Sequence, residues 1–219
     1  PVRKLQALLD ENLEGKTMLP GFLDALYGVA QKAFIGYSDI TLLQLALYKR
    51  YGWVTFSGPM LVTEFASDLI SRESVDHLFS LLMKPRYMWN LNPPSKEEIE
   101  VWRDGETSGP ILGGCLSLLC SMLGSPYLPD LEGAVLIIED TEEQPKHIDR
   151  MLHQLRISGV FEKINGLIIG GFADCFPEVP EKNFTLQELV LNATRKYDFP
   201  IIANYPYGHN LRDRLSIPL

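Results

Sequence analysis

The chain has little cysteine, no long apolar run and fewer basic than acidic residues. Its three cysteines, Cys115, Cys120 and Cys175, form neither a C-x-x-C pair nor a zinc-type cluster, and an odd count argues against a disulfide framework. The longest apolar stretches, residues 111–123 and 134–138, are shorter than the roughly 18 residues of a membrane helix. The sum of 20 Lys and Arg against 28 Asp and Glu gives a formal charge of -8, unlike the basic surface of most nucleic-acid-binding proteins. With no segment typical of a signal peptide, we expect a cytoplasmic protein with neither a nucleic acid nor a membrane as partner.

What remains is the composition of an ordinary globular protein, with 46% hydrophobic and 22% charged residues among 219. Apolar runs alternate with stretches of helical spacing. They predict strands at residues 33–36, 134–138, 165–172 and 200–204, and helices that begin near Ile40, Pro145 and Thr185. This alternation predicts an α/β fold with parallel strands.

Residues 84–109 interrupt the alternation, because they are richer in proline, tryptophan, asparagine and charge. We interpret them as a connecting segment. The expected organisation is therefore an N-terminal α/β domain over residues 1–83 and a C-terminal α/β domain over residues 110–219.

Ser38 lies in the predicted tight turn between the first strand and its helix. Such a turn projects a hydroxyl out of the sheet, next to the free amides of a helix N-terminus, which can receive an oxyanion. The surrounding Gly-Tyr-Ser-Asp differs from the G-x-S-x-G elbow of α/β-hydrolases. A second interpretation therefore stays open, in which Ser38 only caps the helix that starts at Ile40.

Two more candidates follow predicted strands. Glu139 ends an apolar strand, at the edge of an α/β sheet where ligands gather, although Asp140 competes with it and an acidic residue there often only caps a helix. His209 follows the last predicted strand on a loop that contains proline and glycine, which holds it at a sheet edge. The other histidines are interpreted as surface residues: His77, His147 and His153.

Gly113 and Gly114 precede Cys115 and an apolar helical run. A glycine turn that opens a helix offers free N–H groups to a carboxylate. The alternative is that these glycines serve only a tight turn.

Six ordered motifs together resemble the LD-carboxypeptidase family of serine peptidases, which includes murein tetrapeptide carboxypeptidases and microcin C self-immunity peptidases. The similarity extends from about residue 17 to residue 219. The motifs are GYSDIT at residues 36–41, GPM at 58–60, GG at 113–114, IED at 138–140, IDRML at 148–152 and YGH at 207–209.

The resemblance implies a catalytic triad of Ser38, Glu139 and His209. In these roles His209 takes the proton of Ser38 during attack on a carbonyl, and Glu139 orients the imidazole. The resemblance also implies an oxyanion hole made by the backbone N–H of Asp39 and a glycine amide, for which Gly15 is the candidate. Substrate-binding positions are expected at Gly113, Gly114 and Cys115, and neither a metal nor a cofactor is expected.

The chain departs from the family pattern in three places. One is at residues 217–219, after which the family is expected to continue into another strand. Cys115 replaces the asparagine of a Gly-Gly-Asn motif. The segment before Lys16 matches the family poorly, so we expect an incomplete N-terminal domain, with the serine on its strand–turn–helix elbow.

The implied function is hydrolysis of the amide bond between an L- and a D-amino acid in a murein tetrapeptide, as in peptidoglycan recycling. A microcin immunity peptidase that cleaves a peptidyl-nucleotide is the alternative, in which Trp89 or Trp102 stacks on a base rather than packing in the core. A third interpretation is a non-catalytic or truncated relative. We expect a homodimer that acts on a small peptide.

Overall fold

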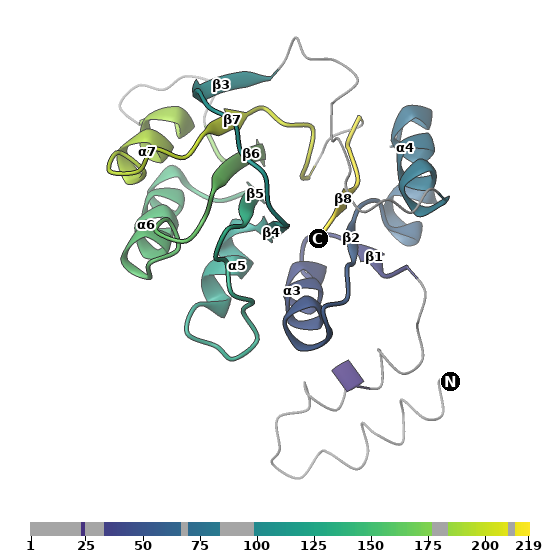
Figure 1. Ribbon diagram of the computed structural model, residues 1–219. Coiled ribbons are helices and arrows are strands. Elements are labelled where there is room, and N and C mark those ends of the chain that lie inside the picture. Colours follow the sequence, from purple (N-terminus) through teal and green to yellow (C-terminus); the bar gives the residue numbers. More distant parts are fainter. Residues whose placement is uncertain (1–22, 25–32, 67–69, 84–98, 177–183, 210–212) are drawn as a thin grey trace.

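The computed structural model describes residues 23–24, 33–66, 70–83, 99–176, 184–209 and 213–219, which contain two β-sheets (Figure 1). The smaller sheet has three strands in the order β1-β2-β8, and the larger has five in the order β3-β7-β6-β5-β4. Within these residues, no helix combines the length and the apolar character needed to cross a membrane.

The smaller sheet contains the strand–turn–helix unit expected at the N-terminal end. β1 (Ile35–Gly36) pairs in parallel with β2 (Phe56–Ser57), and α3 (Ile40–Tyr51) lies between them in the chain. α3 ends at Gly52, whose left-handed φ of 62° suits a residue without a Cβ atom. The π-helical turn η1 (Leu61–Phe65) and α4 (Arg72–Met83) follow.

The C-terminal segment returns to this sheet. β8 (Ile217–Pro218) pairs antiparallel with β2, and the N–H of Leu219 also donates to the carbonyl of Thr55 at 2.8 Å. The smaller sheet therefore joins β1 and β2, near the start of the described residues, to their C-terminal end.

The larger sheet is parallel except for its edge strand β3, which pairs antiparallel with β7. Helices α5 and α6 follow β4 and β5, and α7 precedes β7, as parallel pairing requires crossover connections. The elements are β3 (Glu100–Arg103), β4 (Ile111–Cys115), α5 (Leu116–Met122), β5 (Val135–Thr141), α6 (Pro145–Ile157), β6 (Gly166–Ala173), α7 (Leu186–Ala193) and β7 (Ile201–Ala203).

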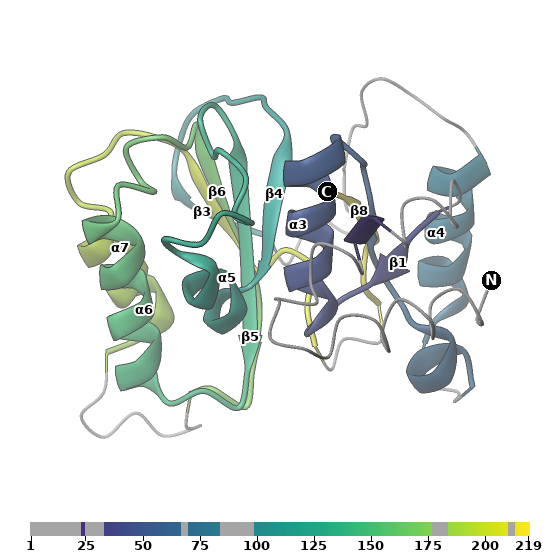
Figure 2. The same ribbon diagram turned by 90° about the horizontal axis from the view of Figure 1, so that it is seen from below.

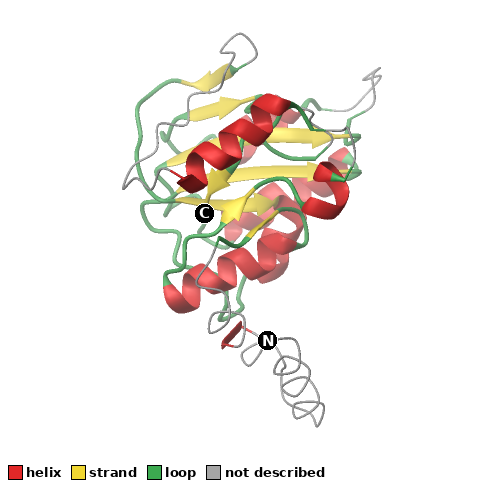
Figure 3. Ribbon diagram, turned by 90° about the vertical axis from the view of Figure 1, so that its right-hand side faces the viewer, coloured by secondary structure: helices red, strands yellow, loops and turns green. Residues whose placement is uncertain are grey.

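The described elements form successive layers. Figure 2 shows α5, α6 and α7 on one side of the larger sheet, then α3, the smaller sheet and α4 on its other side. Figure 3, seen from the α4 side, shows strands with helices both in front of and behind them. Helix α3 is therefore the layer between the two sheets.

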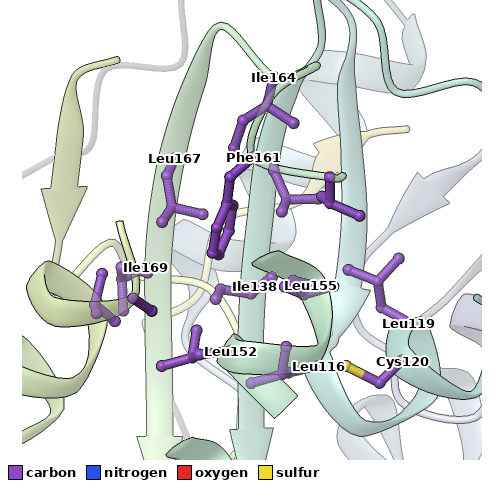
Figure 4. Packing of buried hydrophobic residues seen from close by; sticks show 14 of the residues in the cluster. Leu116, Leu119, Cys120, Ile138, Leu152, Leu155, Phe161, Ile164, Leu167 and Ile169 are labelled. Atoms are coloured by element: carbon purple, nitrogen blue, oxygen red, sulfur yellow. The ribbon is translucent and has the colours of Figure 1, made fainter. Parts of the chain in front are cut away.

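The faces of the larger sheet bury different residues. On the helical side, Leu136 and Ile138 of β5 belong to the main core, with Phe161 and Leu152 packed against them (Figure 4). On the opposite side, Ile137 packs in a second cluster with the C-terminal segment, including Tyr207, Leu215 and Ile217. Because side chains alternate along a strand, Glu139 follows Ile137 toward the C-terminal segment and Asp140 follows Ile138 toward the helices.

Several expectations from the sequence are confirmed. Helix α6 has Pro145 in its first turn and buries Ile148, Leu152 and Leu155. Helix α7 begins with the expected capping box, in which Thr185 and Glu188 bond each other's backbone N–H groups.

Other expectations were wrong. Gly113 and Gly114 do not form a turn that opens a helix: both lie in β4, which continues to Cys115. His77 is not a surface residue either, since its ring is half-buried in α4 and its Nδ1 accepts a hydrogen bond from the backbone N–H of Ser216 at 3.2 Å. The domain boundaries at residues 83 and 110 remain a prediction.

Candidate active site

Ser38 occupies a strained turn directly after β1. Its φ of 60° lies in the left-handed region, which a residue with a side chain rarely adopts. Its carbonyl accepts the N–H of Thr41 at 2.8 Å, while Asp39 is the N-cap of α3. The interpretation of Ser38 as a side-chain helix cap is therefore wrong, and backbone strain of this kind is often found at functional sites.

Glu139 and His209 form a hydrogen-bonded pair. The Nδ1 atom of His209 lies 2.7 Å from Oε2 of Glu139, and the backbone N–H of His209 donates to the same oxygen at 3.2 Å. The Glu139 side chain is 1% exposed, against 15% for His209. Because the carboxylate accepts from Nδ1, the neutral ring keeps Nε2 free of hydrogen and able to accept a proton.

Gly208 permits this contact. A Cβ atom at residue 208 would lie 2.9 Å from Oε2 of Glu139, and the φ of +125° is one that side chains rarely adopt. The glycine before His209 therefore lets the loop pass directly over the carboxylate.

The pKa of His209 is raised above its ordinary value. Burial acts to lower this pKa, but the hydrogen bond and charge of Glu139 and the charge of Asp140 together outweigh burial. The folded protein therefore stabilises the imidazolium form of His209 more than water stabilises that of a free histidine.

Asp140 points to a different partner. Its Oδ2 accepts the N–H of Ser117 in the first turn of α5 at 2.8 Å, and its Oδ1 accepts the N–H of Thr141 at 2.9 Å. The two adjacent carboxylates thus bind different groups: Glu139 bonds to the imidazole of His209, and Asp140 bonds to the start of α5.

Cys115 and the two glycines before it contact protein groups. The Cys115 N–H donates to Oγ1 of Thr41 at 3.3 Å, and its thiol lies 3.1 Å from the Ser117 hydroxyl. A Cβ atom at Gly114 would approach Thr41 Oγ1 to 2.6 Å, and one at Gly113 would approach a backbone oxygen of β5 to 2.0 Å. This close fit seats Thr41 of α3, three residues after Ser38, against β4, whose Cys115 pairs with Glu139 of β5.

The Cys115 thiol is poorly suited to react. Burial, with smaller effects from nearby groups, raises its pKa to about 12, which leaves it protonated near neutral pH.

Sequence reasoning missed a cluster beside the candidate triad. The ring of Tyr37 lies 5.0 Å from the His209 ring, centroid to centroid, in an edge-on arrangement. The Tyr37 phenol donates to Glu64, and the guanidinium carbon of Arg214 lies 4.6 Å above the Tyr37 ring. The only signals in the sequence were an acidic residue within an apolar stretch and an arginine shortly after His209.

Tyr207 also connects to the smaller sheet. Its hydroxyl forms a hydrogen bond with the hydroxyl of Ser57 in β2, and the two oxygens lie 2.9 Å apart. Together with residues of the missed cluster, these two line a small cavity formed by Tyr37, Ser57, Gly58, Tyr207, Gly208, Arg214 and Leu215.

The structure brings together two of the three proposed triad residues by a hydrogen bond. Among the residues that the structure describes, no hydrogen bond joins Ser38 to His209, although Tyr37, the residue before Ser38, contacts the imidazole. Catalytic hydrogen bonds are often long in the absence of substrate. Gly15 and Trp89 lie outside the described residues.

Trp102 packs against the main core, and its indole N–H donates to Oε2 of Glu100 at 2.7 Å. These contacts favour the packing interpretation. Over the described parts of the chain, no group of three or more His, Cys, Asp or Glu side chains is placed to hold a metal ion.

A buried Glu–His pair, whose imidazole contacts the residue before a strained serine, is typical of a serine hydrolase site. Two family models match the chain: the N-terminal domain of LD-carboxypeptidases over residues 17–58 and the C-terminal domain over residues 108–219. The chain belongs to the LD-carboxypeptidase family, a family of serine-type carboxypeptidases.

Individual relatives agree with this assignment. A "probable murein peptide carboxypeptidase" of Bacillus subtilis is 34% identical over 178 residues, which cover 81% of this chain and 55% of the relative. The crystal structure of muramoyltetrapeptide carboxypeptidase from Oxalobacter formigenes is 30% identical, with a TM-score of 0.67 over 85% of this chain and 62% of that one.

A third relative is the microcin C7 self-immunity protein MccF of Escherichia coli, 29% identical over 70% of this chain and 52% of the relative. A structure of MccF in complex with glutamyl sulfamoyl guanosine has the same fold, with 23% identity and a TM-score of 0.75 over 92% of this chain and 67% of that one. The chain spans about half the length of the curated relatives it matches.

Proposed function

We propose that the chain is the catalytic part of a serine peptidase that hydrolyses the amide bond between an L- and a D-amino acid in a murein tetrapeptide. The observation that carries this proposal is the 2.7 Å contact between Glu139 and His209 next to a serine with a φ of 60°. Family membership and the relatives named for murein peptides support the choice of substrate.

In this mechanism His209 accepts the proton of the Ser38 hydroxyl at Nε2 as the oxygen attacks the scissile carbonyl. Glu139 keeps the imidazole in the required tautomer and stabilises its charged form. In this proposal the amide of Asp39, the N-cap residue of α3, donates to the developing oxyanion, and Gly15 is the candidate for a second donor. His209 then returns its proton to the leaving D-amino acid, and water cleaves the acyl-enzyme. No step requires a metal or cofactor.

Mass spectrometry of a murein tetrapeptide incubated with the protein tests this function. Loss of one D-alanine with the parent protein, and no loss with Ser38→Ala, is the expected result. Release of D-alanine by both proteins equally would contradict the assignment of the nucleophile.

The second candidate function is cleavage of a peptidyl-nucleotide, supported by the similarity to MccF. The same assay with an aminoacyl sulfamoyl nucleoside distinguishes the two: preferential cleavage of that compound favours the immunity function. If neither compound is cleaved by folded protein, the chain is a non-catalytic relative or needs more of the family's N-terminal domain.

Cellular context forms part of the proposal. The three cysteines are free and buried, which fits a reducing compartment such as the cytoplasm. We also propose a homodimer, which analytical ultracentrifugation tests.

A further inference from the structure

Tyr37, immediately before the candidate nucleophile, is held by two oppositely charged side chains. Oε1 of Glu64, in η1, accepts a hydrogen bond from the Tyr37 phenol. Its Oε2 accepts one from the backbone N–H of Met60 at 2.8 Å. Arg214 stacks over the Tyr37 ring at 4.6 Å, and its Nη1 atom lies 3.5 Å from Oε1 of Glu64. Both charged side chains are at least nine-tenths buried, with 8% of Arg214 and 6% of Glu64 exposed.

The cluster reaches the imidazole through Tyr37. The rings of Tyr37 and His209 meet at 66°, and their centroids are 5.0 Å apart. This contact is separate from the hydrogen bond that Glu139 makes to Nδ1. The imidazole is thus supported by one residue of the larger sheet, Glu139, and by Tyr37 of the turn over residues 37–39, which carries Ser38.

The charges around the imidazole come from three parts of the fold. The carboxylate of Glu139 faces it from β5, and the charge of Asp140 acts on it from the other face of that strand. The phenol of Tyr37 lies beside it, and the guanidinium of Arg214 belongs to the segment before β8. Among these described groups, Arg214 is the one positive charge, and it opposes the two carboxylates.

We propose that Arg214 and Glu64 form a second support for the catalytic imidazole, in which the guanidinium holds Tyr37 against His209 and opposes the negative charge that β5 presents to the ring. Arg214 and Glu64 are positioning residues, because they act through Tyr37 and through charge. This inference rests on the proposed function, which gives His209 the role of general base.

The consequence is a wider working range on the acid side. Two carboxylates alone favour a protonated imidazole, which cannot accept the Ser38 proton. The buried guanidinium counteracts them, so that a larger fraction of His209 is neutral at a given pH.

NMR titration of the His209 ring, assigned by its loss in His209→Gln, tests the proposal without any substrate. We expect Arg214→Gln to raise the midpoint of the titration by roughly 0.5 to 1 pH unit, and Arg214→Lys to leave it nearly unchanged because the charge remains. Glu64→Gln should lower the midpoint, because it removes a negative charge from the cluster beside the imidazole.

Arg72→Gln is the matched control, since it removes the same charge from an exposed position on α4, where 89% of the side chain is exposed. A midpoint that moves equally in both arginine-to-glutamine variants would overturn the proposal. If Arg214→Gln does not fold, Glu64→Gln decides: a lower midpoint supports the proposal, and an unchanged one overturns it.

Kinetics separate this inference from the proposed function. If the parent cleaves peptide through Ser38 but the Arg214→Gln midpoint stays at the parent value, the second support is wrong and the peptidase stands. If the midpoint moves but no peptide or peptidyl-nucleotide is cleaved, the peptidase assignment fails and the electrostatic coupling stands.

Discussion

Ser38 has a backbone conformation that costs energy, with a φ of 60°. A glycine adopts this conformation without the steric clash of a Cβ atom, which costs about 1 to 2 kcal/mol in other residues. We therefore predict that Ser38→Gly increases the free energy of unfolding by about 1 kcal/mol, whereas Ser38→Ala leaves it nearly unchanged. Urea unfolding measures both.

Both variants should lose at least about a thousandfold in kcat, because the nucleophile is absent. A Ser38→Gly protein that is less stable than the parent would show that the backbone of Ser38 is not strained. Substantial activity in either variant would show that another group performs the attack.

His209 determines the expected pH dependence of catalysis. It must be neutral to accept a proton, and its pKa is raised above the ordinary 6.5 because the Glu139 bond and charge outweigh burial. We predict that kcat/KM falls on the acid side with a midpoint above pH 6.5, and that Glu139→Gln moves this midpoint down while it lowers the rate. A profile that is flat from about pH 5 to pH 8 would exclude a histidine base.

Among elements, α3 and β4 fit together so closely that one methyl group should separate them. A Cβ atom at Gly114 would meet Thr41 Oγ1 at 2.6 Å, in a backbone with a φ of +137°. We predict that Gly114→Ala lowers the free energy of unfolding by roughly 2 to 4 kcal/mol, from overpacking and strain together.

Gly124→Ala is the control, because that position has a φ of +81° and no heavy atom within 4 Å of the added Cβ. Gly124→Ala adds backbone strain without a steric overlap, so it should lower the free energy of unfolding by about 1 kcal/mol. Combining Gly114→Ala with Thr41→Ala should recover part of the loss; strict additivity in this double-mutant cycle would show that the two residues do not interact.

α4 supports the C-terminal segment through His77, and this support depends on pH. Burial lowers the pKa of His77, and only its neutral ring accepts the N–H of Ser216. The unfolded chain takes up this proton near pH 6.5, so His77 should reduce stability as the pH falls below that value and have no effect well above it.

The raised pKa of His209 has the opposite sign, contributing stability below about pH 6.5 that is lost as the pH rises through its folded pKa. The comparison must therefore be between the parent and His77→Gln, which retains a non-titrating acceptor. We predict that the parent loses more melting temperature than His77→Gln between pH 8 and pH 5.5. Equal losses would mean that the pKa of His77 is the same in the folded and the unfolded protein.

The sequence predicts elements with a strong local signal and misses those without one. α6 and α7 were predicted because a stripe of apolar residues and a capping box are local features. β4 was missed because its two glycines are typical of a turn; they are there instead because β5 and Thr41 approach too closely for side chains. β8, with two residues, exists only through pairing with β2.

The candidate site shows the same division at the scale of the molecule. The sequence placed Ser38, Glu139 and His209 at the ends of strands, and the structure joins the latter two by a hydrogen bond. The local pattern left open which of two adjacent carboxylates faces the histidine, because that depends on which face of β5 is covered by helices; only the family resemblance indicated Glu139. Glu64 and Arg214 were missed because 150 residues separate them along the chain.

The two sheets should unfold as one unit. Tyr207 and Ser57 link them through a buried hydrogen bond of 2.9 Å, and the C-terminal segment packs on one sheet while pairing with the other. We predict that Tyr207→Phe lowers protection of α3 and β5 amides from hydrogen exchange by the same amount, about 1 to 2 kcal/mol.

Tyr197→Phe provides the comparison, since its phenol bonds Glu162 at an exposed position. That variant should change protection by less than about 0.5 kcal/mol. Loss of protection in only one sheet of Tyr207→Phe would show that the sheets open independently.

The position of β8 in the chain has a consequence for biosynthesis. A ribosome releases β1, β2 and the turn that carries Ser38 long before it releases residues 209–219. A nascent chain therefore carries Ser38 without His209, and the edge of β2 that pairs with β8 is open. Pairing across such a sequence separation is slow and leaves a strand edge open to other chains. We therefore expect the nascent chain to lack the proposed triad, and to depend most on protection from aggregation, until β8 has been made.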